Sequence, residues 1–248
     1  MSRVEQIGRA TLYLGDCRDV LPAIERPHAI LSDPPYGQSL KTNNAGKGVT
    51  GRSYGAGRPY GTINPKGIAR TWPTGVAGDD KPFDPEHLLV AADKWLLWGA
   101  HKFGHRLPRG RTLVWDKVPT GKVRDQGDGE TALCSVNPDA ALRVYRLLWD
   151  GVCVGSAARH EVTAGRPREH PTQKPESLMA WCLQFLALEP ESLICDPYMG
   201  AGSTGVAAVK AGYSFVGIEI EPVYFDAACR RIEDAQRQGD LFLSGEAA

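Results

Sequence analysis

The stretch that decides the fold of this chain is Ile30-Leu31-Ser32-Asp33-Pro34-Pro35-Tyr36-Gly37. The apolar run 28–31 predicts a buried strand. Because proline cannot donate a hydrogen bond to a neighbouring strand, we expect the strand to stop at Asp33. Proline also holds the residue before it in extended geometry, which stiffens Asp33 and Pro34. The stretch therefore predicts a rigid turn at the carboxyl end of a strand, where open α/β sheets bind their ligands.

The groups on this turn suit the exocyclic amino group of a nucleobase. The Asp33 carboxylate can accept one N–H of the amine, and the Pro34 carbonyl can accept the other. Both hydrogen bonds draw the nitrogen toward tetrahedral geometry and localise its lone pair for attack, while the Tyr36 ring can stack on the base. The alternative is a plain turn, because acidic residues and prolines are common in turns of every kind.

Length and composition predict one globular α/β domain spanning residues 1–248. Of the 248 residues, 42% are hydrophobic and 28 are glycine, which suits a core with long loops. Lys and Arg together number 29, as do Asp and Glu, so the total charge gives no sign of nucleic-acid binding. Any such sign has to come from the distribution of charge along the chain.

The six cysteines are scattered and include no C-x-x-C pair. This spacing favours buried thiols in a reducing compartment over a disulfide framework or a zinc site. The amino terminus is polar and no apolar run approaches about 18 residues, so we expect neither a signal peptide nor a membrane span. The resulting expectation is a cytoplasmic protein.

Strands and helices are expected to alternate, which predicts a mostly parallel sheet covered by helices. The expected strands are 11–15, 28–33, 95–99, 112–116, 141–149, 192–196 and 214–220. The expected helices are a short one carrying Val20, Leu21 and Ile24, the segments 84–94, 101–107, 176–188 and 222–238, and one that ends at Lys210. Residues 117–140 show no pattern and are expected to be irregular.

A long loop, residues 37–80, is rich in Gly, Asn, Thr, Tyr and Pro and lacks hydrophobic periodicity. Loops of this length inside a compact domain are usually functional or mobile. Between residues 38 and 78 it carries six positive charges, interleaved aromatic residues and no acid, which is typical of nucleic-acid contact surfaces. These candidate DNA-contacting residues are Lys41, Lys47, Arg52, Arg58, Lys66 and Arg70. The alternative is a solvated flexible loop.

A second motif, Gly200-Ala-Gly202-Ser-Thr-Gly205, spells G-x-G-x-x-G between a predicted strand and a predicted helix. With Glu219 at the end of the next strand, it satisfies the dinucleotide-binding pattern, so an NAD-dependent oxidoreductase is one interpretation. Charge argues against an NAD site. A pyrophosphate is bound by free backbone N–H groups, and the nearby carboxylates of Asp196, Asp33 and Asp16 would repel it. These carboxylates suit a cation such as S-adenosylmethionine. Glu219 would bind its ribose, and an amine held at Asp33 could attack its methyl group.

Three motifs, in their order along the chain, resemble those of the amino-methyltransferases of DNA. They are Asp33-Pro-Pro-Tyr36, His170-Pro-Thr-Gln-Lys-Pro175 and Asp196-Pro-Tyr-Met-Gly-Ala-Gly202. That family methylates the exocyclic nitrogen of adenine or cytosine with S-adenosylmethionine. Because the catalytic motif precedes the cofactor loop, the chain resembles the circularly permuted β group. The resemblance implies a three-layer, Rossmann-like methyltransferase fold with a mostly parallel sheet of seven-stranded type and one reversed strand near an edge.

The resemblance also implies roles for individual residues. Catalysis would involve Asp33, Pro34, Pro35 and Tyr36. The cofactor would contact Asp16, Thr172, Lys174, Asp196, Pro197, Tyr198, Gly200, Gly202, Ser203, Thr204 and Glu219. Tyr198 stands where the family usually has Phe, and we expect its ring to pack over the cofactor. No residue is expected to bind a metal.

The implied activity is that of a site-specific DNA methyltransferase acting on adenine N6 without a covalent enzyme intermediate. A base inside a duplex cannot reach such a pocket, so the expected substrate is double-stranded DNA with a flipped target base. Residues 117–170 are a candidate target-recognition region. The resemblance further implies a prokaryotic or phage enzyme of the restriction–modification type, with a homodimer as one candidate assembly.

Four alternatives stay open. In the family, an acid at the position of Asp33 favours adenine and serine favours N4 of cytosine, so an N4-cytosine methyltransferase is the nearest alternative. An RNA or protein amine methyltransferase is the second. A catalytically inactive DNA-binding protein and an NAD-dependent oxidoreductase are the third and fourth. The presence of both Asp33 and Asp196 argues against an inactive protein.

Overall fold

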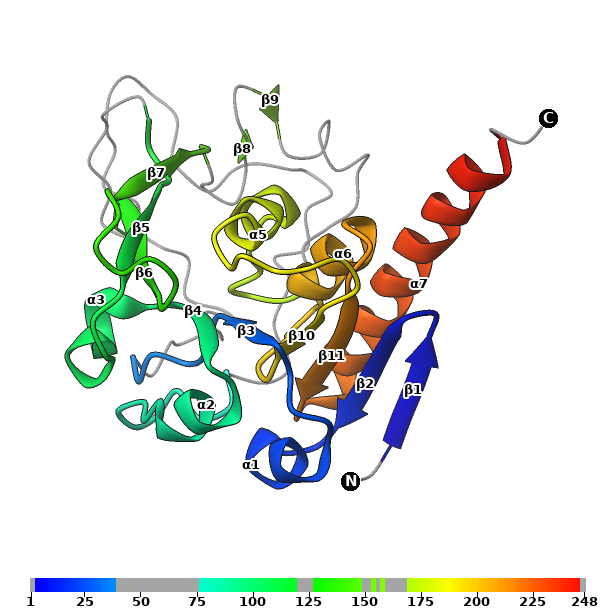
Figure 1. The fold of residues 1–248 in the computed structure, drawn as a ribbon, viewed down its shortest axis with the longest axis horizontal. Coiled ribbons are helices and arrows are strands. Elements are labelled where there is room, and N and C mark those ends of the chain that lie inside the picture. Colours follow the sequence, from blue (N-terminus) through cyan, green and yellow to red (C-terminus); the bar gives the residue numbers. More distant parts are fainter. Residues whose placement is uncertain are drawn as a thin grey trace, which may run out of the picture.

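The computed structural model describes residues 3–38, 76–119, 127–148, 153–154, 157–158 and 169–245. Its largest element is a nine-stranded sheet (Figure 1). The strands of this sheet are β1 Arg3–Ile7, β2 Ala10–Leu14, β3 Ala29–Ser32, β4 Lys94–Trp98, β5 Arg111–Asp116, β6 Gly129–Cys134, β7 Arg143–Arg146, β10 Leu193–Asp196 and β11 Ser214–Glu219. Two short strands, β8 Cys153–Val154 and β9 Ala157–Ala158, form a separate antiparallel pair.

Six α-helices accompany the strands in the described part of the chain. They are α1 Cys17–Val20, α2 Glu86–Ala91, α3 Ala100–Phe103, α5 Glu176–Leu183, α6 Ser203–Lys210 and α7 Pro222–Gly245. Short 3-10 turns extend α1 and α3, at Leu21–Ala23 and Gly104–Arg106. None of the helices built from described residues combines the length and the apolar character that crossing a membrane requires.

The strands lie in the order β1-β2-β11-β10-β3-β4-β6-β5-β7. In this sheet β1 and β6 run against their neighbours, and the remaining strands are parallel to one another. The prediction of a mostly parallel α/β sheet is therefore confirmed. The sheet has nine strands, and the predicted reversed strand near an edge is present as β6. Strand β1 is a second reversed strand, because it forms an additional hairpin with β2. That hairpin turns at Gly8, whose φ of 54° is easy for glycine and strained for other residues.

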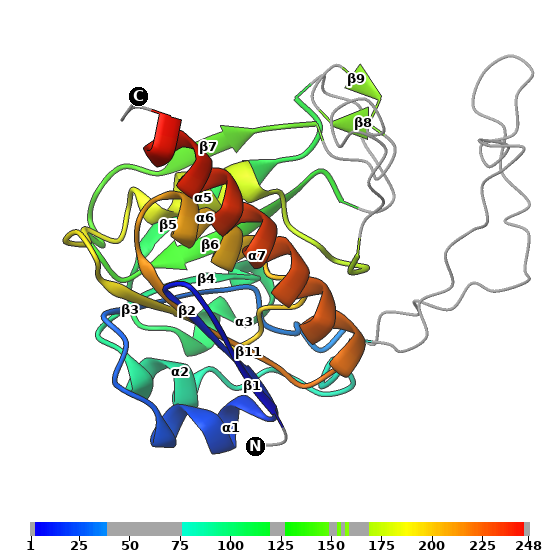
Figure 2. The same cartoon turned by 90° about the vertical axis from the view of Figure 1, so that its right-hand side faces the viewer.

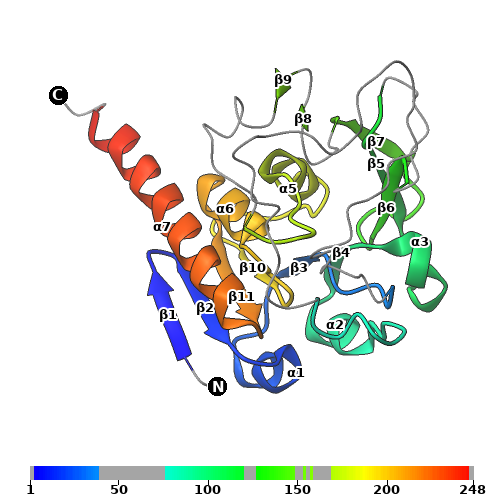
Figure 3. The same cartoon turned by 180° about the vertical axis from the view of Figure 1, so that it is seen from behind.

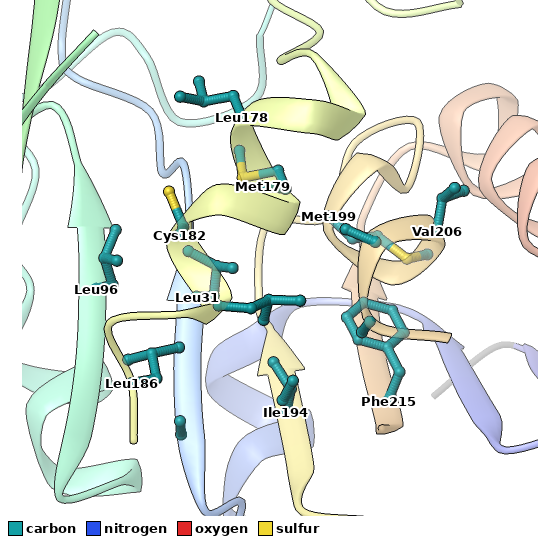
Figure 4. Packing of buried hydrophobic residues seen from close by; sticks show 14 of the residues in the cluster. Leu31, Leu96, Leu178, Met179, Cys182, Leu186, Ile194, Met199, Val206 and Phe215 are labelled. Atoms are coloured by element: carbon teal, nitrogen blue, oxygen red, sulfur yellow. The ribbon is translucent and has the colours of Figure 1, made fainter. Parts of the chain in front are cut away.

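Helices cover both faces of the sheet and make three layers. Helices α5, α6 and α7 lie side by side on one face, and α1, α2 and α3 lie on the other (Figures 2 and 3). Successive strand residues point to opposite faces, so each strand supplies two cores. Leu31 and Leu96 belong to the core on the side of α5 and α6, part of which Figure 4 shows. Ile30 and Leu97 pack on the opposite side.

Several element boundaries differ from the sequence-based predictions. Within the segment 117–140, which was expected to be irregular, residues 129–134 form β6, because β6 pairs with both β4 and β5 and these tertiary partners outweigh its weak local pattern. The helix predicted over 84–94 ends at Ala91, since Ala92 is already extended and Lys94 begins β4. The helix predicted over 176–188 ends at Leu183, and the last helix continues beyond residue 238 to Gly245.

Two of the predicted functional segments fall largely outside the described residues. The candidate DNA-contacting residues all lie there: Lys41, Lys47, Arg52, Arg58, Lys66 and Arg70. Of the candidate recognition region 117–170, the structure describes residues 117–119, 127–148, 153–154, 157–158 and 169–170.

The sheet brings separate parts of the sequence to one edge. Strands β3 and β10 are parallel neighbours, so the turns that begin at Asp33 and Pro197 start side by side. Strand β11 pairs with β10 in the same direction and delivers Glu219 to this edge. Strand β6 is reversed and therefore begins here, with Gly129 opposite Asp116 at the end of β5.

Gly205, the third glycine of the G-x-G-x-x-G motif, packs inside α6. A Cβ at this position would come within 2.5 Å of Ile232 Cδ1 and 2.7 Å of Phe215 Cε1. We expect Gly205→Ala to lower the free energy of unfolding by about 1–3 kcal/mol through overpacking. Each kcal/mol would lower Tm by roughly 2–4 °C in a chain of this size.

The matched control is Gly104→Ala, because a Cβ there would lie 3.6 Å from Ala100 Cβ, which is ordinary contact, and the backbone of Gly104 is helical. Thermal unfolding followed by circular dichroism measures both variants. Equal Tm values for the two variants would contradict the packing role of Gly205.

Candidate active site

A pocket of about 330 Å³ opens at the carboxyl edge of the parallel strands. Pockets that bind small molecules in proteins are typically about 300–1,000 Å³ in volume. Its walls come from the turn after β3, the start of α1, the segment before α5, the turn after β10 and the end of β11. Six carboxylate residues line it, against three residues of the Lys and Arg type. A pocket with this charge balance favours a positively charged ligand over a pyrophosphate.

The turn after β3 is held in shape by Asp79. One oxygen of its carboxylate accepts hydrogen bonds from the backbone N–H groups of Tyr36, Gly37 and Gln38, at 3.1, 2.8 and 3.0 Å. Asp79 is only 4% exposed. Asp79, near the end of the long loop, thus binds the turn at which that loop begins. Nothing in the sequence indicated this contact.

Asp33 is already engaged by two donors at the pocket wall. Its Oδ1 accepts a hydrogen bond from the Tyr36 hydroxyl, and its Oδ2 accepts one from Lys174 Nζ. Burial raises the pKa of Asp33, and Lys174 opposes that shift while Glu130 adds to it. The first and second motifs are therefore joined by an ion pair, which the sequence did not predict.

Glu130 is a site residue that sequence analysis missed. It lies near the start of β6, and its Oε2 is 3.0 Å from Lys174 Nζ and 3.3 Å from the Tyr36 hydroxyl. Its Oε1 pairs with Lys117 Nζ. Burial would raise the pKa of Glu130, but Lys174 and Lys117 outweigh it and lower the pKa to about 2. Glu130 was missed because its strand was expected to be irregular.

The Tyr36 ring is packed from several sides. Lys174 Nζ lies 5.6 Å from the ring centroid, and His101 meets the ring edge-on at 5.7 Å. Gly99, with a φ of 88°, lies so close that a Cβ there would come within 2.2 Å of Tyr36 Cε1. Gly99 is thus a second residue that the sequence gave no reason to assign to the site.

The turn after β10 is built on two buried carboxyl groups. Asp196 accepts hydrogen bonds from Ser32 Oγ at 2.6 Å and from the Tyr198 N–H at 3.1 Å. Glu219 accepts from the N–H groups of Gly200 and Glu221, at 2.9 and 2.8 Å. Burial raises the pKa of Asp196 to about 6 and that of Glu219 to about 7, although these hydrogen bonds oppose the shift.

An aromatic cluster forms the wall beside α1. Asp16 caps that helix by accepting the Arg18 N–H at 2.9 Å, and it lines the pocket with Cys17. The Tyr198 hydroxyl shares a hydrogen bond with His87 Nε2 at 2.8 Å, and its ring meets Phe83 edge-on. The hydroxyl that distinguishes Tyr198 from phenylalanine therefore has a partner within the protein.

The segment before α5 contributes His170, Thr172 and Lys174. Thr172 Oγ1 lies 3.1 Å from His170 Nδ1, and the His170 ring packs edge-on against Tyr224. Burial and then Lys174 lower the pKa of His170 to about 3, so its imidazole is neutral. The Lys174 carbonyl accepts a hydrogen bond from Ser203 Oγ at 2.8 Å. This bond fixes the segment to the start of α6.

Most of the predicted site residues meet at the pocket, and four do not. Those that line it are Asp16, Asp33, Pro34, Pro35, Tyr36, Thr172, Lys174, Pro197, Tyr198, Gly200 and Glu219. Those outside its lining are Asp196, Gly202, Ser203 and Thr204, which are all buried. Among the residues that the structure describes, no three His, Cys, Asp or Glu side chains are grouped so as to hold a metal ion.

Comparison with protein families gives a match over more than half of the chain. A family model described as DNA methylase, for N6 and N4 methyltransferases, matches residues 76–230. This range includes the second and third motifs, β6 with Glu130, and Glu219. The Asp33 motif lies before the matched range.

Two similar bacterial proteins share a shorter segment with the chain. The DNA adenine methyltransferase YhdJ of Escherichia coli (strain K12) is 38% identical over 66 residues, which are 27% of this chain and 22% of that protein. The Type II methyltransferase M.HinfI of Haemophilus influenzae is 37% identical over 67 residues, which are 27% of this chain and 18% of that protein. The matched segments thus span only about a fifth of each relative.

Two solved structures are similar to the chain at low sequence identity. The crystal structure of M1.HpyAVI has a TM-score of 0.49 and 15% identity, covering 90% of this chain and 98% of that one. The PvuII cytosine-N4-specific DNA methyltransferase has a TM-score of 0.49 and 12% identity, covering 95% and 96% of the two chains.

Asp79→Ala tests how the turn after β3 is held. Three N–H groups would lose the one charged oxygen that they share, and a hydrogen bond to a charged group typically contributes roughly 1.5–3 kcal/mol. We expect the variant to lose about 2–4 kcal/mol of stability and to exchange the amide hydrogens of residues 36–38 much faster. Hydrogen exchange with mass spectrometry and chemical denaturation measure the two effects.

The matched control is Asp80→Ala, which removes the exposed neighbouring carboxylate. It should leave both quantities unchanged. If the amides of residues 36–38 exchange at the same rate in both variants, Asp79 does not hold the turn.

Proposed function

The chain belongs to the DNA methylase family of N6 and N4 methyltransferases, and from this premise we propose that it transfers a methyl group from S-adenosylmethionine to adenine N6 in double-stranded DNA. The observation that carries this proposal is the shared pocket of the two motif turns. Asp33 from the first turn and Gly200 from the second line the same pocket, at the ends of adjacent parallel strands. An amine bound at one turn can therefore reach a methyl donor bound at the other.

The pocket suits S-adenosylmethionine by its volume and by its excess of carboxylates. This cofactor would supply a methyl group carried on a positively charged sulfur. Glu219 would accept hydrogen bonds from the ribose hydroxyls, and Asp16 would lie at the adenine, beside the ring of Tyr198. Asp196 would act indirectly, because its carboxylate holds the backbone of the turn at Tyr198. Gly202, Ser203 and Thr204 would likewise support the turn from the start of α6.

Asp33 and Pro34 would hold the target amine. One N–H would donate to the Asp33 carboxylate and the other to the Pro34 carbonyl, which leaves the lone pair directed at the methyl carbon. The nitrogen would form the new bond to the methyl carbon as the electron pair of the broken C–S bond leaves on the sulfur of S-adenosylmethionine. The nitrogen then carries a positive charge, and it loses one proton to the Asp33 carboxylate or to water. No covalent bond to the protein is required.

DNA would reach this pocket with the target base flipped out of the helix, at a cost of a few kcal/mol for unstacking. The six positive residues between 38 and 78 follow directly after the catalytic turn in the sequence. We propose that they contact DNA phosphates and that residues 117–170 read the target sequence. Five cysteines are free thiols, which supports function in a reducing cytoplasm: Cys17, Cys134, Cys182, Cys195 and Cys229.

Asp33→Ala tests the catalytic assignment. Removing one preorganised group that stabilises developing charge typically costs ~10²–10³ in rate, and we expect a loss of this size. Affinity for S-adenosylmethionine should be largely unchanged, and Lys174 keeps Glu130 as its partner. Single-turnover transfer of a labelled methyl group to DNA and calorimetry with the cofactor measure the two quantities. A variant with more than about a tenth of the wild-type rate would refute the assignment.

Mass spectrometry of nucleosides from the methylated DNA identifies the product in the same experiment. N6-methyladenine is expected. N4-methylcytosine as the sole product would establish the nearest alternative, and tight binding of NAD without methyl transfer would establish the oxidoreductase.

Glu219 predicts a pH dependence of cofactor binding. Burial raises the pKa of Glu219 to about 7, so its protonated form stabilises the ligand-free protein at low pH. This contribution to stability is lost as the pH rises through 7. Ribose hydroxyls donate to the ionised carboxylate, so affinity should strengthen from about pH 6 to pH 8, by at most about tenfold per pH unit. Calorimetry at several pH values measures this change.

The Glu219→Gln variant provides the comparison, because its amide does not titrate. It should bind S-adenosylmethionine more weakly than wild type and with a flatter pH profile. A wild-type affinity that stays constant across this pH range would rule out the role given to Glu219.

A further inference from the structure

Lys174 lies between two carboxylates at the point where the target amine is expected to bind. Its ammonium pairs with Asp33 Oδ2 and lies 3.0 Å from Glu130 Oε2. We propose that Glu130 is a positioning residue that draws Lys174 away from Asp33 when the target base enters. This inference rests on the proposed function, because it concerns how Asp33 becomes free to accept the amine.

The need for such a displacement follows from the contacts of Asp33. Tyr36 occupies its Oδ1 and Lys174 occupies its Oδ2, so both oxygens already accept a strong donor. During methyl transfer the attacking nitrogen gains positive charge. An ammonium fixed on Asp33 would repel that charge and would weaken the carboxylate as an acceptor. Transfer is therefore faster if Lys174 pairs with a different carboxylate.

Glu130 is placed to be that carboxylate. It is already within hydrogen-bonding distance of Lys174 Nζ, so the ammonium changes partner by a small shift and stays paired throughout. The Tyr36 hydroxyl also reaches both carboxylates, since it donates to Asp33 and lies 3.3 Å from Glu130 Oε2. The hydroxyl and the ammonium thus have the same two acceptors.

Lys117 holds the Glu130 side chain in a position from which it can pair with Lys174. Its ammonium pairs with Glu130 Oε1, which leaves Oε2 directed at Lys174. Lys117 Nζ also lies 4.6 Å from the centroid of the Trp115 ring, where a cation is attracted to the ring face. After the exchange both ammonium groups pair with Glu130, and Asp33 is left to face the target nitrogen as that nitrogen gains positive charge.

The reversed strand explains how Glu130 comes to be here. Parallel strands place their carboxyl ends at the pocket edge, so a residue at the amino end of a parallel strand would lie on the far side of the sheet. Because β6 is antiparallel to β4 and β5, its second residue lies at the pocket edge, opposite Trp115. Lys117 follows the end of β5 on the same side.

Another reading of these contacts is a static ion-pair network that only stabilises the fold. A static network predicts that removing the Glu130 charge changes stability and leaves the methyl-transfer step alone at temperatures where the protein is folded. The positioning role predicts instead a slower transfer step, because Lys174 would then remain on Asp33. It also predicts that the defect disappears when Lys174 loses its charge.

Glu130→Gln is the first variant, since glutamine keeps the shape and removes the charge. At saturating S-adenosylmethionine, we expect the single-turnover rate to fall by about 10–100-fold, the effect of a unit charge several ångströms from a developing positive charge. The dissociation constant for the cofactor should stay near the wild-type value. Glu130→Asp retains the charge and should recover part of the rate.

Removing the charge of Lys174 separates positioning from structure. The double variant Glu130→Gln with Lys174→Met removes both charges and should transfer methyl groups faster than Glu130→Gln alone. Thermal unfolding of every variant shows that each is folded during the assay.

The outcomes distinguish this inference from the function on which it rests. A wild-type protein that methylates DNA, together with a Glu130→Gln variant of equal rate, would overturn the positioning role and leave the proposed function intact. A double variant as slow as Glu130→Gln would also overturn it. Failure of the wild-type protein to methylate DNA would overturn the proposed function and this inference together.

Discussion

The parallel pairing of β3 with β10 is the constraint on which the candidate site depends. Ile194 and Cys195 pair with Ala29 and Ile30, so the two motif turns leave the sheet side by side. The buried hydrogen bond from Ser32 to Asp196, 2.6 Å long, joins the ends of the two strands. A slip of one residue in this pairing would turn every side chain of β3 to the opposite face and separate the two turns.

The buried ion pairs at this edge of the sheet position the side chains more than they stabilise the fold. Taking ions out of water costs several kcal/mol each, and buried ion pairs recover this cost only when their partners are well placed. Here the two carboxylates and two ammoniums alternate, so each charge has an opposite neighbour. Such a group holds Asp33 in position, and Lys174 opposes the burial that raises the pKa of Asp33.

At the cofactor end of the pocket, the buried carboxyl groups are held by hydrogen bonds and not by ion pairs. Asp196 and Glu219 are buried without a cationic side chain among their hydrogen-bond partners, and the pKa of each is raised as a result. Backbone N–H groups and a serine hydroxyl satisfy them in part. A bound cation would favour their ionised forms, so ligand binding at this end would be coupled to the release of protons. The same carboxylates make the pocket a poor place for a pyrophosphate.

The sequence alone determined the alternation of strands and helices, the two motif turns and the residues on them. This was achievable because proline, glycine and runs of apolar residues constrain the backbone locally, whatever the rest of the chain does. Only the tertiary structure decided that β6 is a strand, because its pairing with β4 and β5 outweighs its weak local pattern. For the same reason Glu130, Lys117 and Asp79 could not be assigned from sequence. Each reaches the site through a contact with residues distant in the chain, and only strand order and direction bring those residues together.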